Sequence, residues 1–320
     1  MKGYYSKTRN ENGKYSIVFN KKESEGVSVQ LPCGQCIGCR LERSRQWAVR
    51  CMHEASLYKD NCFLTLTFNN DNLNSDGSLV KRDFVLFMKR LRKKFGSKIR
   101  FFHCGEYGSK LSRPHHHACI FNFDFPDKVL WTVRDGIKLY RSKSLEKLWP
   151  YGFCTIGSVT FESAAYVARY ITKKITGKKA ESHYEKINKE TGEVVKIVPE
   201  YITMSRRPGI ARAWFEKFKD DVYPSDFVII RNNIKCKPPK YYDKIYDEMT
   251  LDETNGYRVI TGYKEFDYIN LTTSSKMRKI KMERKCRASA HTYDNTFDRL
   301  RVREEIQSTR SEKLIRGYEK

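Results

Sequence analysis

Two kinds of hydrophobic pattern stand out in the first third of the chain. Residues 62–68 alternate aromatic or β-branched residues with others and run into the polar stretch 69–72, which predicts a strand that ends there. Residues 79–95 predict an amphipathic helix, because their apolar residues recur at helical spacing while Lys and Arg take the other positions. These apolar residues are Phe84, Phe87, Met88 and Leu91.

The same analysis predicts three more strands and a second helix. The strands fall within 101–108, 113–121 and 152–159, and the helix covers 164–174, which contains no Gly or Pro. The order strand, helix, strand, strand, strand, helix is typical of an antiparallel sheet with helices on it. We therefore expect the α+β class, with a central antiparallel sheet, helices packed on it and a basic C-terminal extension.

The flanking regions predict further elements and a division into four regions. The elements are a basic helix, a hairpin, a helix opened by two arginines, a second hairpin and a short helix, at 39–54, 183–203, 206–218, 227–237 and 240–249. The regions are an N-terminal segment with a Cys-rich turn and the basic helix, a core, an accessory region of hairpins and helices, and a basic tail that is helical or partly disordered. They cover 1–60, 61–180, 181–271 and 272–320.

Two histidines on one predicted strand have the spacing of metal ligands. Alternate residues of a strand face the same side, so His115 and His117 project together while His116 points the other way. If this strand pairs with the preceding one as a hairpin, Glu106 reaches both imidazoles. The ordinary explanation is a set of surface or core histidines, and it remains open at this point.

Two tyrosines lie one turn apart on the predicted helix 164–174. Tyr166 and Tyr170 share a face, and Arg169 and Lys173 each follow a tyrosine by three residues on the adjoining surface, with Lys174 beside them. An aromatic stripe at this spacing is more often part of a core. A core stripe is not normally interleaved with so many cations, although these also fit a solvated face.

Three cysteines form a compact motif near residue 36. Cys33, Cys36 and Cys39 follow the spacing Cys-x-x-Cys-x-x-Cys, which suits zinc or an iron–sulfur cluster, although a closed structural site takes four ligands. Cys51 lies too far along the predicted helix to be the fourth. Cys236 and Cys286 are distant candidates, and three free thiols lining a turn are the alternative.

Composition favours a polyanionic partner. Lys and Arg number 62 against 38 Asp and Glu, and the net charge of +24 favours nucleic acid through release of condensed counterions. An anionic membrane is the competing partner, but no apolar run approaches the about 20 residues that span a bilayer, and no signal peptide opens the chain. We expect a cytosolic protein with no membrane partner, in which the ten cysteines are thiols or metal ligands.

Taken together, the motifs resemble a known family. A His-x-His strand followed some fifty residues later by a helix with Tyr-x-x-x-Tyr resembles the HUH endonucleases, which initiate rolling-circle replication. More narrowly, the chain is similar to the replication initiation proteins of the microvirus group of small single-stranded DNA phages, the gokushoviruses in particular. The residues that carry this resemblance are 33–40, 63–68, 105–108, 113–117, 165–170 and 206–210.

The resemblance implies an HUH endonuclease-like core over 61–180 and a specific reaction. Such an enzyme nicks one strand of phage DNA at the origin, stores the phosphodiester energy in a 5′-phosphotyrosine, and later rejoins the strand. It implies Mg²⁺ or Mn²⁺ held by Glu106, His115 and His117. The implied partners are single-stranded and origin DNA and a host helicase and polymerase, in the cytoplasm of the host bacterium.

The tyrosines have a defined part in that chemistry. A phenol with a pKa near 10 needs activation at neutral pH, and Arg169 and Lys173 are placed to lower that cost. With a pair, Tyr166 carries the nicked strand while Tyr170 attacks the regenerated origin, or the reverse. The chain departs from the family pattern at His116, which stands where a bulky hydrophobic residue is usual, and in the placing of cations after the tyrosines.

DNA contacts are expected at two arginines. Arg206 and Arg207 open a predicted helix and make a plausible phosphate clamp, with Lys174 as a further contact, while a plain surface turn is the alternative. Two other functions remain open. One is a related tyrosine transposase or relaxase, and the other is a non-catalytic nucleic-acid-binding protein whose His and Cys residues hold structural zinc.

Overall fold

The computed structural model describes residues 2–9, 15–108, 111–173, 179–187, 192–230, 233–251, 273–289 and 297–314. The chain forms two compact units: a first unit of Met1–Cys39 with Lys219–Ile306, and a second unit of Arg40–Phe218 with Gln307–Lys320. The four regions predicted from the sequence, with boundaries after residues 60, 180 and 271, stay a prediction. Within the described part of the chain, no helix combines the length and the apolar character needed to cross a membrane.

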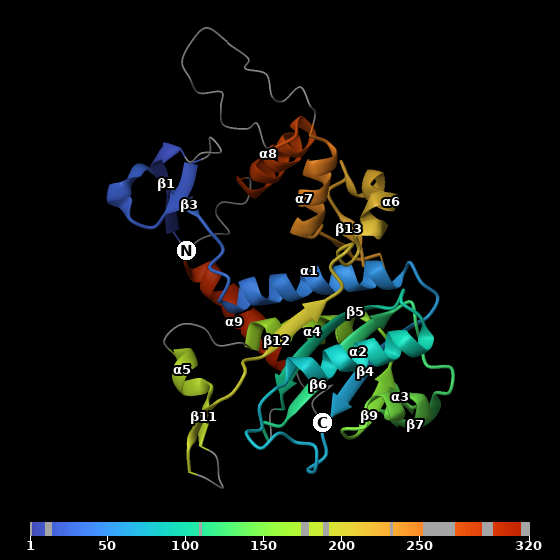
Figure 1. Ribbon diagram of the computed structural model, residues 1–320. Coiled ribbons are helices and arrows are strands. Elements are labelled where there is room, and N and C mark those ends of the chain that lie inside the picture. Colours follow the sequence, from blue (N-terminus) through green and yellow to red (C-terminus); the bar gives the residue numbers. More distant parts are fainter. Residues whose placement is uncertain are drawn as a thin grey trace. The chain divides into compact units, whose positions relative to one another are not determined.

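The second unit is built on a seven-stranded antiparallel sheet (Figure 1). Its strand order is β12-β5-β6-β4-β9-β8-β7, so β6 and β4 lie in the middle. The strands are β4 (Asn61–Thr67), β5 (Arg100–Tyr107), β6 (Pro114–Phe121), β7 (Val129–Arg134), β8 (Ile137–Arg141), β9 (Cys154–Gly157) and β12 (Tyr201–Met204). The helices that pack on this sheet complete an α+β fold, as the sequence predicts.

Helices cover both faces of this sheet, and strand alternation decides which residues each helix meets. Helix α2 (Lys81–Phe95) packs on the face that carries Leu64, Leu66 and His116, which we call the α2 face. Helix α4 (Phe161–Lys173) packs on the opposite face, which carries Glu106 and His117 and which we call the α4 face.

A third helix, α1 (Ile37–Ala55), also lies on the α4 face. Trp47 of this helix stacks on Phe102 of β5 with ring centroids 4.7 Å apart. The hydroxyl of Ser44 donates to the carbonyl oxygen of Ala165, at 2.9 Å, and joins α1 to α4. The α4 face is therefore closed by two helices in contact with each other.

The main core lies between the sheet and α2. Phe87 and Leu91 of α2 are fully buried against Leu64 and Leu66 of β4. Full burial of each such side chain stabilises the fold by about 1.5–3 kcal/mol. The short helix α3 (Lys143–Leu148) adds Leu145, and Trp149 follows it with its indole N–H donating to the carbonyl oxygen of Thr67 at 2.8 Å.

The sheet is wider than the sequence indicates. The segment before α3 was expected only to connect two strands, but it forms the β7–β8 hairpin and adds two strands at the edge. Val129, Leu130, Trp131 and Val133 of β7 are exposed, so no alternation of buried and exposed residues signals the strand.

The predicted hairpin 183–203 is correct only in its first part. Strands β10 (Glu185–Ile187) and β11 (Val194–Lys196) pair as expected, after a short helix α5 (Lys179–His183). Strand β12 instead pairs with β5 at the far edge of the sheet. Tyr201 of β12 lies over Gly105, where a Cβ atom would come within 2.9 Å of the tyrosine ring.

The helix predicted to start at Arg206 starts later. Helix α6 covers Arg212–Val222, and a turn occupies the residues from Arg206 to Ala211. Ala211 has φ of +62°, which a right-handed helix does not accommodate, so the helix cannot extend back through this residue toward Arg206.

The first unit contains small sheets and basic helices. Strands β1 (Lys2–Arg9), β2 (Tyr15–Val18) and β3 (Ser24–Gln30) form a sheet in the order β2-β1-β3, with a 3-10 turn η1 (Lys21–Glu23) before β3. The second predicted hairpin is confirmed as β13 (Val228–Ile229) with β14 (Lys235–Cys236), and the short helix as α7 (Lys240–Met249). Helices α8 (Ser275–Ser289) and α9 (Phe297–Leu314) follow.

A buried ion-pair network ties α8 to the rest of the first unit. Arg284 donates to Asp243 of α7 at 2.7 Å and to Asp226 at 2.9 Å, and Asp243 also accepts from the hydroxyl of Tyr223. Met277 of α8 is fully buried. This part of the basic tail therefore packs through both charge and apolar contacts, although no apolar periodicity in the sequence signals a core there.

Two buried histidines pair on the α2 face. Nε2 of His103 lies 3.1 Å from Nδ1 of His116, and Nδ1 of His103 lies 2.8 Å from the hydroxyl of Thr203. The ring of His103 stacks on Phe84 at 3.5 Å. Burial, together with the neighbouring His116, holds the pKa of His103 well below its usual range, so this ring is neutral in the folded protein.

The neutral His103 predicts a loss of stability in mild acid. An unfolded chain takes up a proton on this histidine below about pH 6.5, whereas the folded chain does not, so falling pH favours unfolding by about 1.4 kcal/mol per pH unit. We expect the free energy of unfolding of the wild type, relative to that of His103→Gln, to decrease from pH 7 to pH 5 in urea titrations. A difference that stays constant over this range would contradict the neutral state.

Candidate functional site

The β5–β6 hairpin brings the three predicted metal ligands together. Glu106 of β5 is directly opposite His115 of β6, and His117 is two residues further along the same face. Gly108 donates its N–H to the carbonyl oxygen of Arg113 at 2.9 Å and closes the strand ends. The pairing expected from the sequence is therefore confirmed, and it places one carboxylate between two imidazoles.

The three side chains converge tightly. Nε2 of His115 and Nε2 of His117 each lie 2.7 Å from the same oxygen of Glu106, Oε1. One candidate ligand atom from each residue lies within 4.8 Å of the other two. Glu106 is only 1% exposed, and its second oxygen, Oε2, is buried without a hydrogen-bond partner among the described residues.

Each imidazole is oriented by a hydrogen bond on its other nitrogen. Nδ1 of His115 lies 3.1 Å from the carbonyl oxygen of Arg113, which can only accept, so this Nδ1 carries the proton. Nδ1 of His117 lies 3.0 Å from the hydroxyl of Thr65 on the central strand β4. Both rings thus present Nε2 to Glu106, which is the arrangement that outer partners impose on metal-binding histidines.

The carboxylate of Glu106 is held in its charged form. Burial alone would raise the pKa of Glu106, but hydrogen bonds from His115 and His117 outweigh burial, and the net pKa lies below the usual value. A buried carboxylate in this state needs positive charge beside it. The donor set of one carboxylate and two imidazoles, with one carboxylate oxygen unpaired, fits a divalent cation.

Helix α4 places Tyr166 against these residues. Its hydroxyl donates to Oε1 of Glu106 at 3.3 Å, and its ring meets the ring of His117 edge to face at 5.0 Å. The guanidinium of Arg169 lies 5.8 Å from the centre of the Tyr166 ring. Of the predicted cations, this one is therefore close to the tyrosine.

A cap fixes where α4 begins and hence where Tyr166 lies. The N–H of Ser163 donates to the hydroxyl of Thr160 at 3.1 Å, and the N–H of Thr160 donates back to the hydroxyl of Ser163 at 2.8 Å. This reciprocal pair satisfies N–H groups that a helix start leaves open. Tyr170 and Lys173 belong to the backbone of α4, but their side chains, and Lys174 as a whole, lie outside the described residues.

The cysteine motif forms a second cluster of possible ligands. The Sγ atoms of Cys33, Cys36 and Cys39 lie within 4.8 Å of one another. Cys51 is fully buried further along α1 and belongs to no such group among the described residues, as expected from the helix length.

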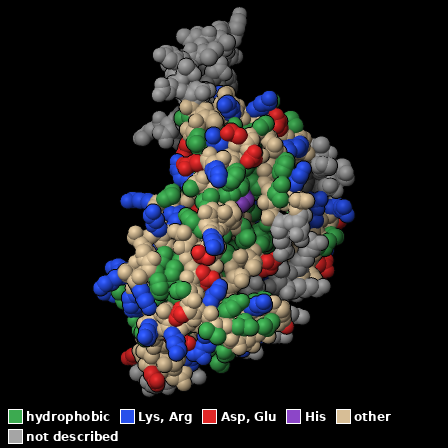
Figure 2. All heavy atoms as spheres, turned by 90° about the vertical axis from the view of Figure 1, so that its right-hand side faces the viewer, with side chains coloured by type: hydrophobic (Ala, Val, Ile, Leu, Met, Phe, Trp, Pro, Cys, Tyr) green, Lys and Arg blue, Asp and Glu red, His purple; other side chains and the backbone are tan. Residues whose placement is uncertain are grey.

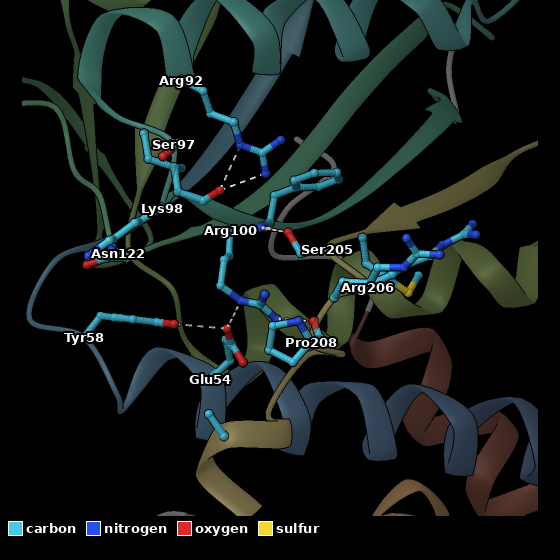
Figure 3. Close-up of a pocket in the computed structure, with 15 residues that line it drawn as sticks. Glu54, Tyr58, Arg92, Ser97, Lys98, Arg100, Asn122, Ser205, Arg206 and Pro208 are labelled. Carbon is cyan, nitrogen blue, oxygen red and sulfur yellow. Dashed lines mark hydrogen bonds and ion pairs between the residues drawn. The ribbon is translucent and has the colours of Figure 1, made fainter.

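The two arginines expected to contact DNA line a pocket of about 720 Å³ (Figure 3). Arg206 and Arg207 lie in the turn before α6 and are exposed. The pocket is also lined by Arg92, Lys98 and Arg100, which makes its wall strongly basic. It lies at the opposite end of β5 from Glu106, since Arg100 is the first residue of that strand.

A buried carboxylate holds the arginine turn in place. Glu54 of α1 forms an ion pair with Arg100, and its other oxygen accepts the N–H of Ala211 at 2.5 Å. Figure 3 shows Arg100 pointing toward Glu54 beside Pro208, and Arg100 also donates to the carbonyl oxygen of Pro208 at 2.8 Å. The turn is therefore tied to both α1 and β5.

Some residues at these sites were not found from the sequence. Thr65, Glu54 and Arg100 act through strands and helices far apart in the chain, and no local pattern marks them. Conversely, two residues of the basic helix suggested to face DNA are used in packing. Arg50 lies over the Trp47 ring at 4.0 Å and donates to the carbonyl oxygen of Ile210 at 3.0 Å.

The basic charge is not concentrated on the face shown in Figure 2. There, Lys and Arg side chains lie scattered among acidic and hydrophobic side chains. The net charge by itself therefore does not mark a nucleic-acid path on that face, and the geometry of individual residues is more informative.

Comparison with known proteins places this arrangement in a family. Residues 61–175 match the family model of the phage replication-associated protein ORF2. The chain is 35% identical over 242 residues to the replication-associated protein VP4 of Bdellovibrio phage phiMH2K, covering 72% of each chain. It is 35% identical over 240 residues to the replication-associated protein ORF2 of Spiroplasma virus 4, covering 71% of each chain.

A shorter match is the replication-associated protein ORF4 of Chlamydia phage 1, 36% identical over 156 residues, or 46% of this chain and 39% of that protein. No solved structure matches the chain. The family match covers the strands and the helix that carry Glu106, His115, His117 and Tyr166. The chain belongs to the family of phage replication-associated proteins, as a replication initiator of the microvirus type.

Proposed function

We propose that this protein is a metal-dependent endonuclease that nicks one strand of phage DNA at the origin, joins itself to the 5′ phosphate through a tyrosine, and later rejoins the strand. The observation that carries the proposal is the hydroxyl of Tyr166, 3.3 Å from Glu106 Oε1 and next to His117. A nucleophile beside a cation-binding donor set is the minimum equipment for strand transfer without a nucleotide cofactor.

The metal site in this proposal is formed by Glu106, His115 and His117. Mg²⁺ or Mn²⁺ bound there would polarise the scissile phosphate and stabilise the charge that develops on its oxygens. The resemblance to the HUH endonucleases favours these two ions. Imidazoles alone bind zinc, copper or nickel more tightly, so availability in the cell decides occupancy.

The chain's own residues would carry the covalent step. The phenolic oxygen of Tyr166 forms a bond to phosphorus, the bond from phosphorus to the 3′ oxygen breaks, and the leaving 3′ oxygen takes up a proton. One phosphodiester replaces another, so rejoining needs no added energy. Arg169 lowers the cost of the phenolate, because a nearby cation favours the charged form of an acid.

A second tyrosine would allow repeated rounds. In this proposal Tyr170 attacks the regenerated origin while Tyr166 still carries the strand, with Lys173 as the second activating cation. The work takes place in the cytoplasm of the host bacterium, where a host helicase and polymerase extend the freed 3′ end.

DNA would be held at a distance from the chemistry. Arg100 and Glu106 are six residues apart on β5, which corresponds to about 20 Å along the strand. We propose that Arg206 and Arg207, at the Arg100 end, contact phosphates of the same DNA, and that Lys174 is a further contact. Exposed arginines on a fixed turn suit this role, since phosphate contacts supply most of the affinity and position the nucleic acid.

Covalent capture tests the nuclease reaction. Single-stranded origin DNA labelled on the 3′ side of the nick is incubated with Mn²⁺ or Mg²⁺, and label that stays with the protein is measured on a denaturing gel. We expect an adduct that EDTA, His117→Ala or the double variant Tyr166→Phe/Tyr170→Phe abolishes, while Tyr151→Phe leaves it unchanged. Tight DNA binding with no adduct for any metal would favour the non-catalytic nucleic-acid-binding alternative.

The hydroxyl of Thr65 predicts a measurable effect on metal affinity. Thr65→Val removes the partner of His117 Nδ1 and keeps the side-chain shape, so the ring loses its fixed orientation. We expect Mn²⁺ to bind about 10-fold or more weakly by calorimetry, as is typical when such a partner is lost. Thr67→Val is the matched control, since this hydroxyl donates instead to the carbonyl oxygen of Phe153. Equal affinities for Thr65→Val and wild type would argue against the proposed ligand set.

Salt dependence tests the arginine contacts. For Arg206→Ala/Arg207→Ala we expect weaker single-stranded DNA binding and a slope of log K against log salt smaller by about 1.4, or about 0.7 per lost phosphate contact. Lys143→Ala/Lys147→Ala on α3 removes the same charge elsewhere and should change the slope less. If both double variants change the slope equally, the effect is one of net charge and the arginines have no special place.

A further inference from the structure

The cysteine motif is a built cluster that the proposed nuclease chemistry does not use. Cys33 and Cys36 lie in the loop before α1, and Cys39 lies in the first turn of that helix. The Sγ atoms of Cys33 and Cys39 are 3.9 Å apart, and all three sulfurs lie within 4.8 Å of one another. Three thiols that meet in this way need an explanation.

The sulfur spacing fits a single tetrahedral ion. With zinc–sulfur bonds of about 2.3 Å, two thiolates on one tetrahedral zinc stand about 3.8 Å apart. The observed 3.9 Å is close to that edge. In an iron–sulfur cluster the thiolates bind different iron atoms and surround a cage, so they do not converge on one point.

A disulfide explains the cluster less well. A sulfur–sulfur bond is about 2.05 Å long, much shorter than the observed separation of Cys33 and Cys39. Three cysteines also leave one thiol over in any pairing. A zinc ion uses all three at once.

The local backbone is arranged for an anionic sulfur. Gly34 has φ of +73°, a conformation that favours glycine, and it turns the loop back on itself. The N–H of Cys36 then donates to Sγ of Cys33 at 3.2 Å. Negative charge near the start of a helix is favourable, and the first turn of α1 contains no acidic side chain that would supply it.

We propose that Cys33, Cys36 and Cys39 bind one zinc ion, which fixes the loop 31–36 to the start of α1. Zinc binding displaces the protons of the three thiols to solvent. Among the described residues the cluster contains only these three ligands, so water or a ligand from outside the cluster takes the fourth position. The role is structural, since the zinc supplies rigidity where the loop has few apolar side chains.

Zinc content and cobalt spectra of the full chain test this site. The protein is produced in the His117→Ala background, which weakens the other candidate metal site, and purified under reducing conditions. We expect about one zinc per chain by elemental analysis, a near-ultraviolet sulfur-to-cobalt band after exchange with Co²⁺, and loss of both in Cys33→Ser and Cys39→Ser. Cys286→Ser, which removes an exposed thiol outside the cluster, should keep both.

Two results would overturn the proposal. One is a chain without zinc whose cobalt form lacks the thiolate band, a measurement that needs no cysteine variant and so does not depend on the folding of one. The other is equal loss of zinc from Cys33→Ser and Cys286→Ser, which would mean that exposed thiols bind zinc without a built site. DNA nicking is not the readout, so the result is independent of the proposed nuclease function.

Discussion

The buried carboxylate of Glu106 is the constraint on which the candidate site depends. A charged group taken out of water needs compensation by opposite charge and hydrogen bonds. Here two imidazoles and the hydroxyl of Tyr166 converge on Oε1, while Oε2 stays without a partner among the described residues. The β5–β6 register, the partner on β4 and the start of α4 all serve this one atom, because a shift of any of them would leave the charge uncompensated.

Strand alternation lets three consecutive histidines do two different jobs. His115 and His117 face α4 with their ring nitrogens fixed toward Glu106, whereas His116 faces α2 and packs among Phe84 and Trp149. The family pattern has a bulky hydrophobic residue at this middle position. His116 fills the same space, and His103 hydrogen-bonds one of its nitrogens, so a polar ring replaces an apolar one inside the core. The departure from the family pattern thus has a packing partner.

What could be predicted from the sequence was local. Glu106, His115 and His117 follow from alternation within two strands joined by a short turn, and the α+β class follows from the order of elements. Thr65 could not be found, since its contact with His117 requires knowing that β4 pairs with β6. Strand β12 was misassigned to a local hairpin for the same reason, because its pairing with β5 spans about a hundred residues. The start of α6 depended on the backbone of a single residue, Ala211.

A second buried carboxylate extends the same logic to the other end of β5. Glu54 is 2% exposed and is compensated by Arg100 and by the N–H of Ala211. Arg100 and Glu106 belong to one continuous strand in the sheet, and a paired strand is stiff compared with a loop. The turn that carries Arg206 is therefore held at a fixed distance from Tyr166 by main-chain geometry. If the arginines hold DNA, the length of β5 sets how far from that grip the strand is cut.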